Sequence, residues 1–328
     1  MDFIPYKSYE EQLDSIADKN ISLDYEDEQK DIMRLKNHSY YSLINGYKSF
    51  FLENNRPDWM VDGTTFDQFY FLRTLEMDLG AILLKYLQVV EQGFRTRVSH
   101  IIAREYTTND QLYTLKTNYC DTNQRLKITF AMDKIRDNPN KNSYSYYFKE
   151  HKHVSIPPWI LIQDLEFAKV IYLYEMLNDP LRKEIRQEYI ILDSSYALEN
   201  KQFANSMHFI REYRNIFAHS KRNFKEKINF SLDHQLSQQC FLATLMNNTG
   251  YYANEKSKSL YMCILLVMSY LQDDFLRERF FEELYVMFLK DKYINEDLKA
   301  NVLFNDITIY TYFDLPETFF QDLHAALN

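Results

Sequence analysis

The hydrophobic residues of this chain recur at helical spacing over most of its length. Between residues 203 and 217, four apolar residues and one arginine fall at steps of four, three, four and three, which places them on one helix face. A longer helical pattern covers residues 66–106, with a break expected near residues 79–80. The chain has only 5 Gly and 7 Pro, so turn signals are few. These features predict an all-α fold, a multi-helix bundle.

Shorter helical patterns fill much of the remaining chain. We expect helices at residues 6–19, 26–36, 124–136, 179–189, 197–219, 234–246, 256–272 and 275–292, and a short one near the end. Another is expected to open at Pro157 and run to Leu177, because proline is tolerated in a first helical turn. The polar stretch 137–147 is typical of a loop. It predicts a division into a helical N-terminal half, residues 1–150, and a C-terminal half, residues 151–328.

Composition argues against several classes of protein. The most apolar run, residues 260–271, is about 12 residues long and suits a buried helix better than a membrane span. Together with an N-terminus unlike a signal peptide, it predicts a cytoplasmic protein without membrane contact. The three cysteines are scattered, and His151 and His153 have no acid or cysteine at ligand spacing. We therefore expect no metal site and no cofactor.

Charge is unevenly distributed along the chain. The formal net charge is −9, and residues 10–31 contribute nine acids against two lysines. Residues 208–227 instead carry six basic residues against two acids: Arg211, Arg214, Lys221, Arg222, Lys225 and Lys227. A basic patch on an acidic body suits an enzyme that takes RNA at one place. The alternative is a solvated helix end.

Arg214 and His219 are the candidate chemical pair. Arg214 lies on the apolar face of helix 197–219, where a guanidinium must be paired or must bind an anion, because it cannot lose its charge. His219 follows five residues later and is the side chain best suited to moving protons near neutral pH. Arg–His pairs at this or a nearby spacing are expected about once by chance in a chain of this composition. A second pair, Arg95 and His100, does occur, and Arg95 can also pair with Glu91 along the helix.

The residues around Arg214 and His219 resemble motifs of known protein families. Arg214-Asn215 followed by Ala218-His219 at a helix end resembles the R-N-x-x-A-H form of the R-x4-6-H motif of HEPN ribonucleases. Residues 37–48, NHSYYSLINGYK, and the Pro-Pro-Trp helix are similar to signatures of Abi-like proteins (AbiD/AbiF type) of bacterial abortive infection. The resemblance implies a HEPN-like helical core in the C-terminal half. In the Pro-Pro-Trp helix, Gln163 stands where this family commonly has an acid.

The resemblance and the chemistry of the residues imply an endoribonuclease. RNA can be cleaved without metal when its 2′-OH attacks the neighbouring phosphate, which requires proton transfer and positive charge on the phosphorane. His219 suits the proton transfer, Arg214 the phosphate contact, and Asn215 the orientation of either. Arg211, Lys221 and Arg222 would extend the RNA path. Such an enzyme would act as an abortive-infection toxin and leave a 2′,3′-cyclic phosphate.

Helix geometry predicts that the site needs a second part. Residues five apart are separated by about 140° around a helix, so Arg214 and His219 do not share a face. A second motif copy would supply the missing group, either in a homodimer, as the HEPN resemblance implies, or from Arg95 and His100 within the chain.

The alternative is a non-catalytic module that binds RNA or protein, with a small RNA as a candidate regulator. In that case Arg214 would pair with an acid from the Trp159 helix, where Asp164 and Glu166 lie close to Gln163. The two hypotheses differ in whether Arg214 faces an open basic cleft or a buried carboxylate.

Overall fold

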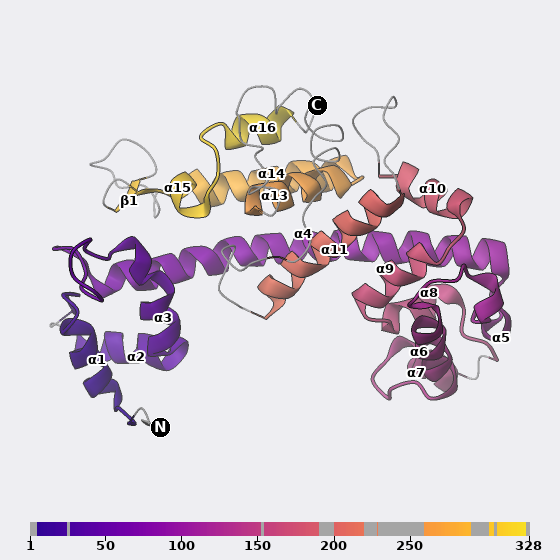
Figure 1. Cartoon of the computed structure of the whole chain (residues 1–328), viewed down its shortest axis with the longest axis horizontal. Helices are drawn as coiled ribbons and strands as arrows, with labels where there is room; N and C mark the ends of the chain where they lie inside the picture. The colour runs from indigo at the N-terminus through magenta and orange to yellow at the C-terminus, as the bar shows by residue number, and fades with distance from the viewer. Residues whose placement is uncertain are drawn as a thin grey trace.

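The fold is organised around one long helix, α4, which runs from Phe66 to Tyr106. The computed structural model describes residues 5–24, 27–151, 154–189, 200–219, 228, 259–289, 302–304 and 307–325. Helix α4 has 41 residues, which corresponds to about 60 Å, and a capping box between Thr65 and Gln68 fixes its start. The break expected near Gly80 is absent, so the helix extends along most of the molecule (Figure 1).

The N-terminal helices pack around the beginning of α4 (Figure 1). They are α1 (Tyr9–Ala17), α2 (Glu28–His38), α3 (Tyr40–Tyr47) and the 3-10 turn η1 (Lys48–Phe50). The segment NHSYYSLINGYK forms the junction of α2 with α3, and Gly46 lies near the end of α3. Buried Tyr47 donates a hydrogen bond to Glu76 of α4 at 2.8 Å. This segment therefore packs the N-terminal helices against α4.

A second group of helices surrounds the other end of α4. It comprises α5 (Asp110–Tyr113), η2 (Lys116–Asn118), α6 (Arg125–Asp137), α7 (Tyr144–Glu150), α8 (Pro158–Leu161), η3 (Ile162–Asp164), α9 (Phe167–Glu175) and α10 (Asp179–Gln187). Helix α7 replaces part of the loop that was predicted over residues 137–147. Its first turn is capped by Asp164, which accepts hydrogen bonds from the amides of Tyr144 and Ser145.

The single helix predicted from Pro157 to Leu177 is wrong, because the chain breaks between α8 and α9. The carbonyl oxygens of Ile162 and Leu165 accept hydrogen bonds from Nη1 of Arg95 at 2.8 and 2.7 Å. Arg95 is itself buried in α4. Because this one guanidinium donates hydrogen bonds to both carbonyls, the break can lie in the interior of the protein.

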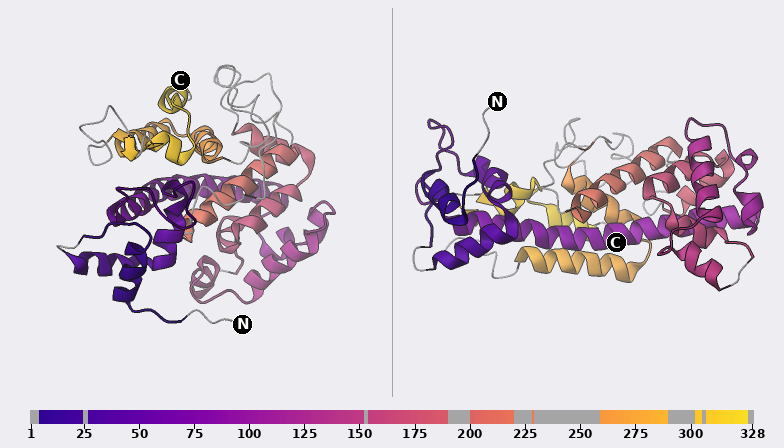
Figure 2. Two further views of the ribbon diagram at one scale, coloured as in Figure 1. Left: turned by 60° about the vertical axis from the view of Figure 1, so that its left-hand side comes forward. Right: turned by 90° about the horizontal axis from the view of Figure 1, so that it is seen from below.

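Helix α11 (Asn200–Ala218) crosses α4 diagonally and also packs against α9 and α10 (Figures 1 and 2). Helix α13 (Leu260–Tyr270) packs against both α11 and α4, and α14 (Asp274–Leu289) packs along α4. The antiparallel strands β1 (Val302–Phe304) and β2 (Ile307–Thr308), α15 (Ile309–Phe313) and α16 (Phe319–Ala325) follow, and they lie above α4 in Figure 1. Every residue of α13 is buried, as its uniformly apolar sequence predicts. The all-α prediction is confirmed. The helix expected at 234–246 lies outside the described residues.

The hydrophobic core is continuous along α4 and includes buried residues from both sides of position 150. The division of the chain into residues 1–150 and 151–328 stays a prediction. Among the described helices, none combines the length and the apolar character that crossing a bilayer requires.

Candidate functional site

Helix α11 carries the candidate motif on a face that is fixed against α4. Phe203, Met207 and Ile210 are fully buried, as the helical spacing predicted. Phe217, near the helix end, lies against Gly80: a Cβ atom added at Gly80 would come within 3.2 Å of its ring. This close approach holds the motif-bearing end of α11 on the long helix. It also explains a glycine inside α4, where glycine otherwise disfavours a helix.

The Arg214 side chain pairs with a buried carboxylate of α4, that of Glu91. Nε of Arg214 lies 3.0 Å from Oε2 of Glu91 without the alignment of a hydrogen bond, so this contact is an ion pair. Oε1 of Glu91 accepts two hydrogen bonds from Arg95, at 3.1 Å from Nε and 2.6 Å from Nη2. Glu91 thus bridges two arginines. We call these three side chains the Arg–Glu–Arg cluster.

The three members of the cluster differ in exposure. The Glu91 and Arg95 side chains are each 8% exposed, whereas that of Arg214 is 31% exposed. A buried carboxylate is tolerated only when it is paired, and Arg95 supplies that pairing through two hydrogen bonds. The cluster carries two positive charges and one negative charge. Its excess positive charge therefore lies on its most accessible member, Arg214.

The acid that holds Arg214 lies on α4 and not on the Trp159 helix, which was the predicted source of a partner. Asp164 caps α7, and Glu166 pairs with Lys169 at 2.8 Å. The predicted pairing of Glu91 with Arg95 along α4 is confirmed. The sequence indicates the Glu91–Arg95 pair through its i, i+4 spacing. It does not indicate that Arg214 joins this pair, because that contact depends on how α11 crosses α4.

Asn215 and His219 continue the motif to the end of α11. Nη1 of Arg214 donates to Oδ1 of Asn215 at 3.1 Å, so Asn215 contacts the guanidinium. The backbone amide of His219 donates to the carbonyl of Asn215 at 3.1 Å, and its side chain is exposed. The imidazole is therefore accessible to a ligand at the helix end. No contact joins the Arg214 and His219 side chains among the described residues, in keeping with the 140° separation expected from their spacing.

The other candidate residues are placed as follows. Arg211, one turn before Arg214, lies 3.2 Å from Glu212 and is partly buried. Lys221 and Arg222 lie outside the described residues. Arg95 is committed to Glu91 and to two carbonyls, whereas His100 is exposed. Arg95 is thus linked to Arg214 through Glu91 and does not form a pair with His100.

His208 was not identified from the sequence, yet it lies buried one helical turn and a half before Arg214. It is 3% exposed, and its ring packs against that of Tyr172 with centroids 5.1 Å apart. Burial, followed by the positive charge of Arg211, lowers the pKa of His208 to about 4. The buried imidazole is therefore neutral at pH 7. Within the described residues, no group of three or more His, Cys, Asp or Glu side chains could hold a metal ion.

Comparison with protein families matches the chain to the Abi-like protein family over residues 33–225. The matched region starts in α2 and includes the whole of α4 and α11, with every member of the Arg–Glu–Arg cluster. The chain belongs to the Abi-like family. This membership suggests a function in abortive infection. No curated protein and no solved structure matches this Abi-like chain.

The Arg–Glu–Arg cluster predicts an order of stabilities for this Abi-like protein. Glu91→Gln leaves two guanidinium groups facing each other with no carboxylate, and we expect it to lower the free energy of unfolding by about 3–5 kcal/mol. Arg214→Gln leaves Glu91 paired with Arg95, so about 1 kcal/mol should be lost. Urea unfolding followed by circular dichroism measures both values. Equal losses in the two variants would contradict the bridging role of Glu91.

His208 predicts a loss of stability in acid. Its folded-state pKa of about 4 lies below the ordinary value of 6.5, so between these values the unfolded chain binds a proton that the folded chain does not. The contribution of neutral His208 to the free energy of unfolding is fully present above about pH 6.5. It falls by about 2–3 kcal/mol as the pH approaches 4. Urea unfolding over this range should show a shallower decline for His208→Gln than for wild type. His151→Gln, at an exposed position, should follow the wild type; a His208→Gln curve parallel to both would refute the assignment.

Proposed function

We propose that this Abi-like protein is a metal-independent endoribonuclease that acts as an abortive-infection toxin. The observation that carries the proposal is the charge state of the Arg–Glu–Arg cluster. Glu91 is already paired with Arg95, and so Arg214 keeps positive charge available to an anion while remaining fixed in position. A guanidinium that is held by protein and partly open to solvent suits recognition of a phosphate. An exposed imidazole, that of His219, follows at the same helix end.

In the proposed reaction, the phosphorus of an RNA phosphodiester is transferred from the 5′ oxygen to the neighbouring 2′ oxygen. The 2′ oxygen forms a bond to phosphorus, the bond from phosphorus to the 5′ oxygen breaks, and a 2′,3′-cyclic phosphate and a 5′-OH result. A base takes the 2′ proton and an acid protonates the leaving 5′ oxygen. His219 acts in proton transfer. Arg214 stabilises the negative charge on the phosphorane, and Asn215 orients its guanidinium.

The reaction also favours a homodimer. One imidazole cannot readily serve as base and acid at once, whereas two copies of His219 from two chains divide these roles. Arg95 is occupied by Glu91 and by backbone carbonyls, which favours a second chain over the Arg95 and His100 pair as the source of the second group. Arg211, Lys221 and Arg222 would guide the RNA in the cytoplasm, with a small RNA as a candidate regulator.

A second candidate function is a non-catalytic module that binds RNA or protein. The observation in its favour is that Arg214 does pair with a buried carboxylate, which gives the arginine a structural role. Under this alternative, Arg214 joins α11 to α4, and His219 is an exposed residue at a helix end. The two functions differ in whether the loss of His219 abolishes a reaction.

The test is cleavage of total bacterial RNA by purified protein in EDTA. We expect His219→Ala to lower the cleavage rate by about 10²-fold or more, because proton transfer of this kind contributes about 10²–10⁴-fold. Arg214→Ala should cause a loss of similar order. His151→Ala is the matched control, since His151 is exposed and lies outside α11.

Circular dichroism establishes that each variant is folded before its rate is compared. Equal rates in the wild type and the His219→Ala variant would point to a contaminating nuclease and refute the assignment. RNA binding without cleavage by the wild type would favour the non-catalytic module.

A further inference from the structure

The end of α11 that carries His219 is attached to α4 by an ion pair and by an apolar contact. The ion pair joins Arg214 to Glu91. The apolar contact lies three residues further along α11, where the Phe217 ring approaches Gly80 of α4. Phe217 is the last large apolar residue of α11, and His219 follows it by two positions. Of the two attachments, the Phe217 contact is therefore the nearer to His219 along the chain.

The Phe217 ring is confined by Gly80 and by a second aromatic residue. Tyr213, one turn earlier on α11, is fully buried, and its ring stacks on that of Phe217 with centroids 6.1 Å and planes 26° apart. Because protein interiors are close-packed, a Phe217 ring displaced from Gly80 cannot move into the core beside Tyr213. It shifts the end of α11 or turns toward solvent, and in both cases the helix end loses its contact with α4.

The absence of a side chain at position 80 leaves room for this contact. A Cβ atom at Gly80 would lie 3.2 Å from Cδ1 and 3.8 Å from Cε1 of Phe217. Carbon atoms pack best at about 3.5–4.0 Å, so the first of these distances is too short. Glycine disfavours a helix interior, and here it stands inside a helix of 41 residues. The close approach of the Phe217 ring is the gain that accompanies this cost.

The second glycine of α4, Gly93, has neighbours of a different kind. A Cβ atom there would lie 3.1 Å from Nη1 of Arg97, one turn later on α4, and 3.8 Å from the hydroxyl of Tyr189. The Arg97 guanidinium is the end of a flexible side chain, so it can give way without moving a helix. Gly80 and Gly93 are both half-buried in the same helix, but the first one alone faces the end of α11. Gly93 therefore serves as a reference for Gly80.

We propose that Gly80 is a positioning residue of the candidate site. It lets the Phe217 ring lie directly on α4 and so sets where the end of α11 places the His219 imidazole. The His219 amide donates to the Asn215 carbonyl at 3.1 Å, so His219 follows any shift of this last turn. A misplacement of about 1 Å can slow a reaction about 10²-fold. The effect of Gly80 on cleavage rests on the proposed function, whereas its effect on the placement of His219 does not.

Changing side-chain size at positions 80 and 217 of the full-length chain tests this role. Gly80→Ala should lower kcat for RNA cleavage in EDTA about tenfold or more, with KM changed by about twofold or less. The reason is that it misplaces a proton-transfer group without removing a contact to RNA. In a Phe217→Leu background, the smaller side chain leaves room for the new Cβ atom, so the same Gly80→Ala change should cost less than about twofold.

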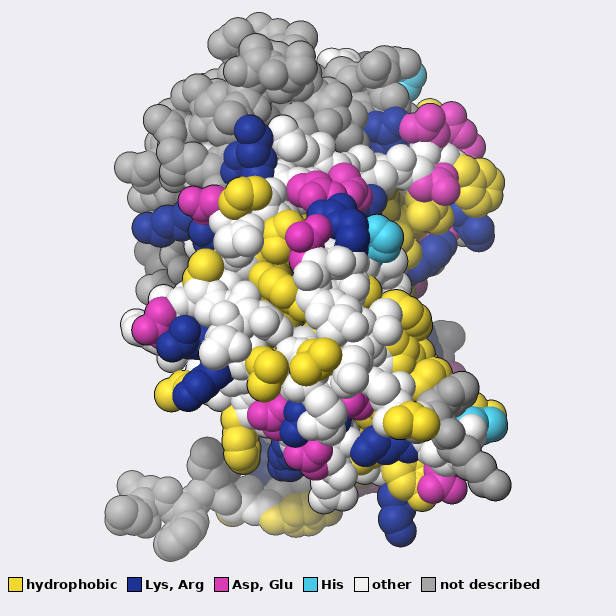
Figure 3. All heavy atoms as spheres, turned by 90° about the vertical axis from the view of Figure 1, so that its right-hand side faces the viewer, with side chains coloured by type: hydrophobic (Ala, Val, Ile, Leu, Met, Phe, Trp, Pro, Cys, Tyr) yellow, Lys and Arg dark blue, Asp and Glu magenta, His cyan; other side chains and the backbone are white. Residues whose placement is uncertain are grey.

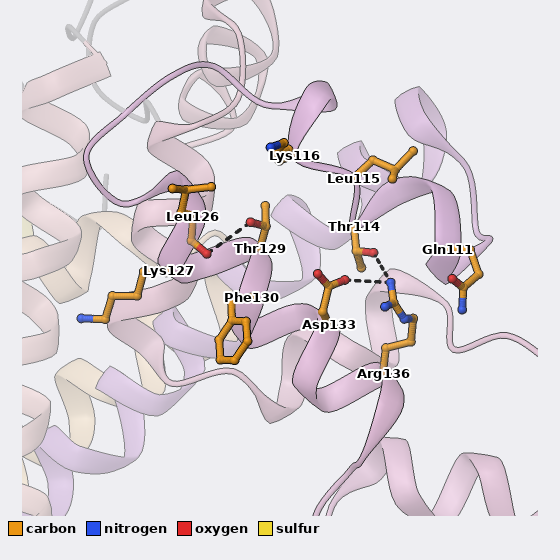
Figure 4. A pocket seen from close by; sticks show the side chains of 10 residues that line it. All are labelled: Gln111, Thr114, Leu115, Lys116, Leu126, Lys127, Thr129, Phe130, Asp133 and Arg136. Atoms are coloured by element: carbon orange, nitrogen blue, oxygen red, sulfur yellow. Dashed lines mark hydrogen bonds and ion pairs between the residues drawn. The ribbon is translucent and has the colours of Figure 1, made fainter.

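Two matched variants separate this contact from general effects. Gly93→Ala makes the same change in the same helix and should keep the wild-type kcat and KM. Phe130→Leu matches Phe217→Leu at a residue of α6 that is 70% exposed, and it should also cleave like wild type. Phe130 lines a groove of about 720 Å³ formed by α5, η2 and α6 (Figure 4). Figure 3, which faces this end of the molecule, shows hydrophobic side chains on its surface.

Two further measurements do not depend on catalysis. The His219 ring signal in a ¹H–¹³C NMR spectrum, assigned with His219→Ala, should shift in Gly80→Ala and stay in place in Gly93→Ala. In the Phe217→Leu background, Gly80→Ala should cause no further shift. In urea unfolding, Gly93→Ala should raise the midpoint because alanine favours a helix, whereas Gly80→Ala should raise it only in the Phe217→Leu background.

An unshifted His219 signal in Gly80→Ala, or an equal shift in Gly93→Ala, would overturn the proposal. So would a loss of kcat in Gly80→Ala that is as large in the Phe217→Leu background as in the wild type, because the effect would then not pass through the Phe217 ring. A wild type that cleaves no RNA, with the His219 signal following the expected pattern, would refute the ribonuclease and leave the placement of His219 by Gly80 established.

Discussion

The structure depends on one buried carboxylate, Glu91, which lies between two arginines of different helices. A carboxylate in the interior of a protein is costly, and Arg95 offsets that cost from the same helix face. Arg95 also satisfies the carbonyls at the break between α8 and α9. Because Arg95 donates two hydrogen bonds to Glu91, the carboxylate can also pair with Arg214 while the cluster keeps a net positive charge. The same ion cluster therefore joins three parts of the chain and leaves a positive charge near the end of α11.

The long helix α4 makes this arrangement possible. It supplies Glu91 and Arg95, and it carries Gly80 where Phe217 approaches. A helix of this length is stable because its buried stripe is covered by helices from both halves of the chain. The motif of α11 is consequently positioned by residues more than 100 positions earlier in the sequence.

The sequence predicted those features that depend on local pattern. The apolar face of α11, the extent of α4 and the pairing of Glu91 with Arg95 all follow from helical periodicity, and the structure confirms them. It did not predict the break after α8, because the carbonyls there are satisfied by Arg95 from a distant helix. Likewise, Glu91 as the partner of Arg214 depends on the crossing of two helices. The chemical roles of Arg214, Asn215 and His219 stay predictions.

End-group analysis of RNA cleaved in EDTA tests the proposed chemistry most directly. Attack by the 2′-OH predicts fragments that end in a 2′,3′-cyclic phosphate and begin with a 5′-OH, and these should disappear with His219→Ala. Fragments with 3′-OH and 5′-phosphate ends would contradict it, because water rather than the 2′ oxygen would then have attacked the phosphate.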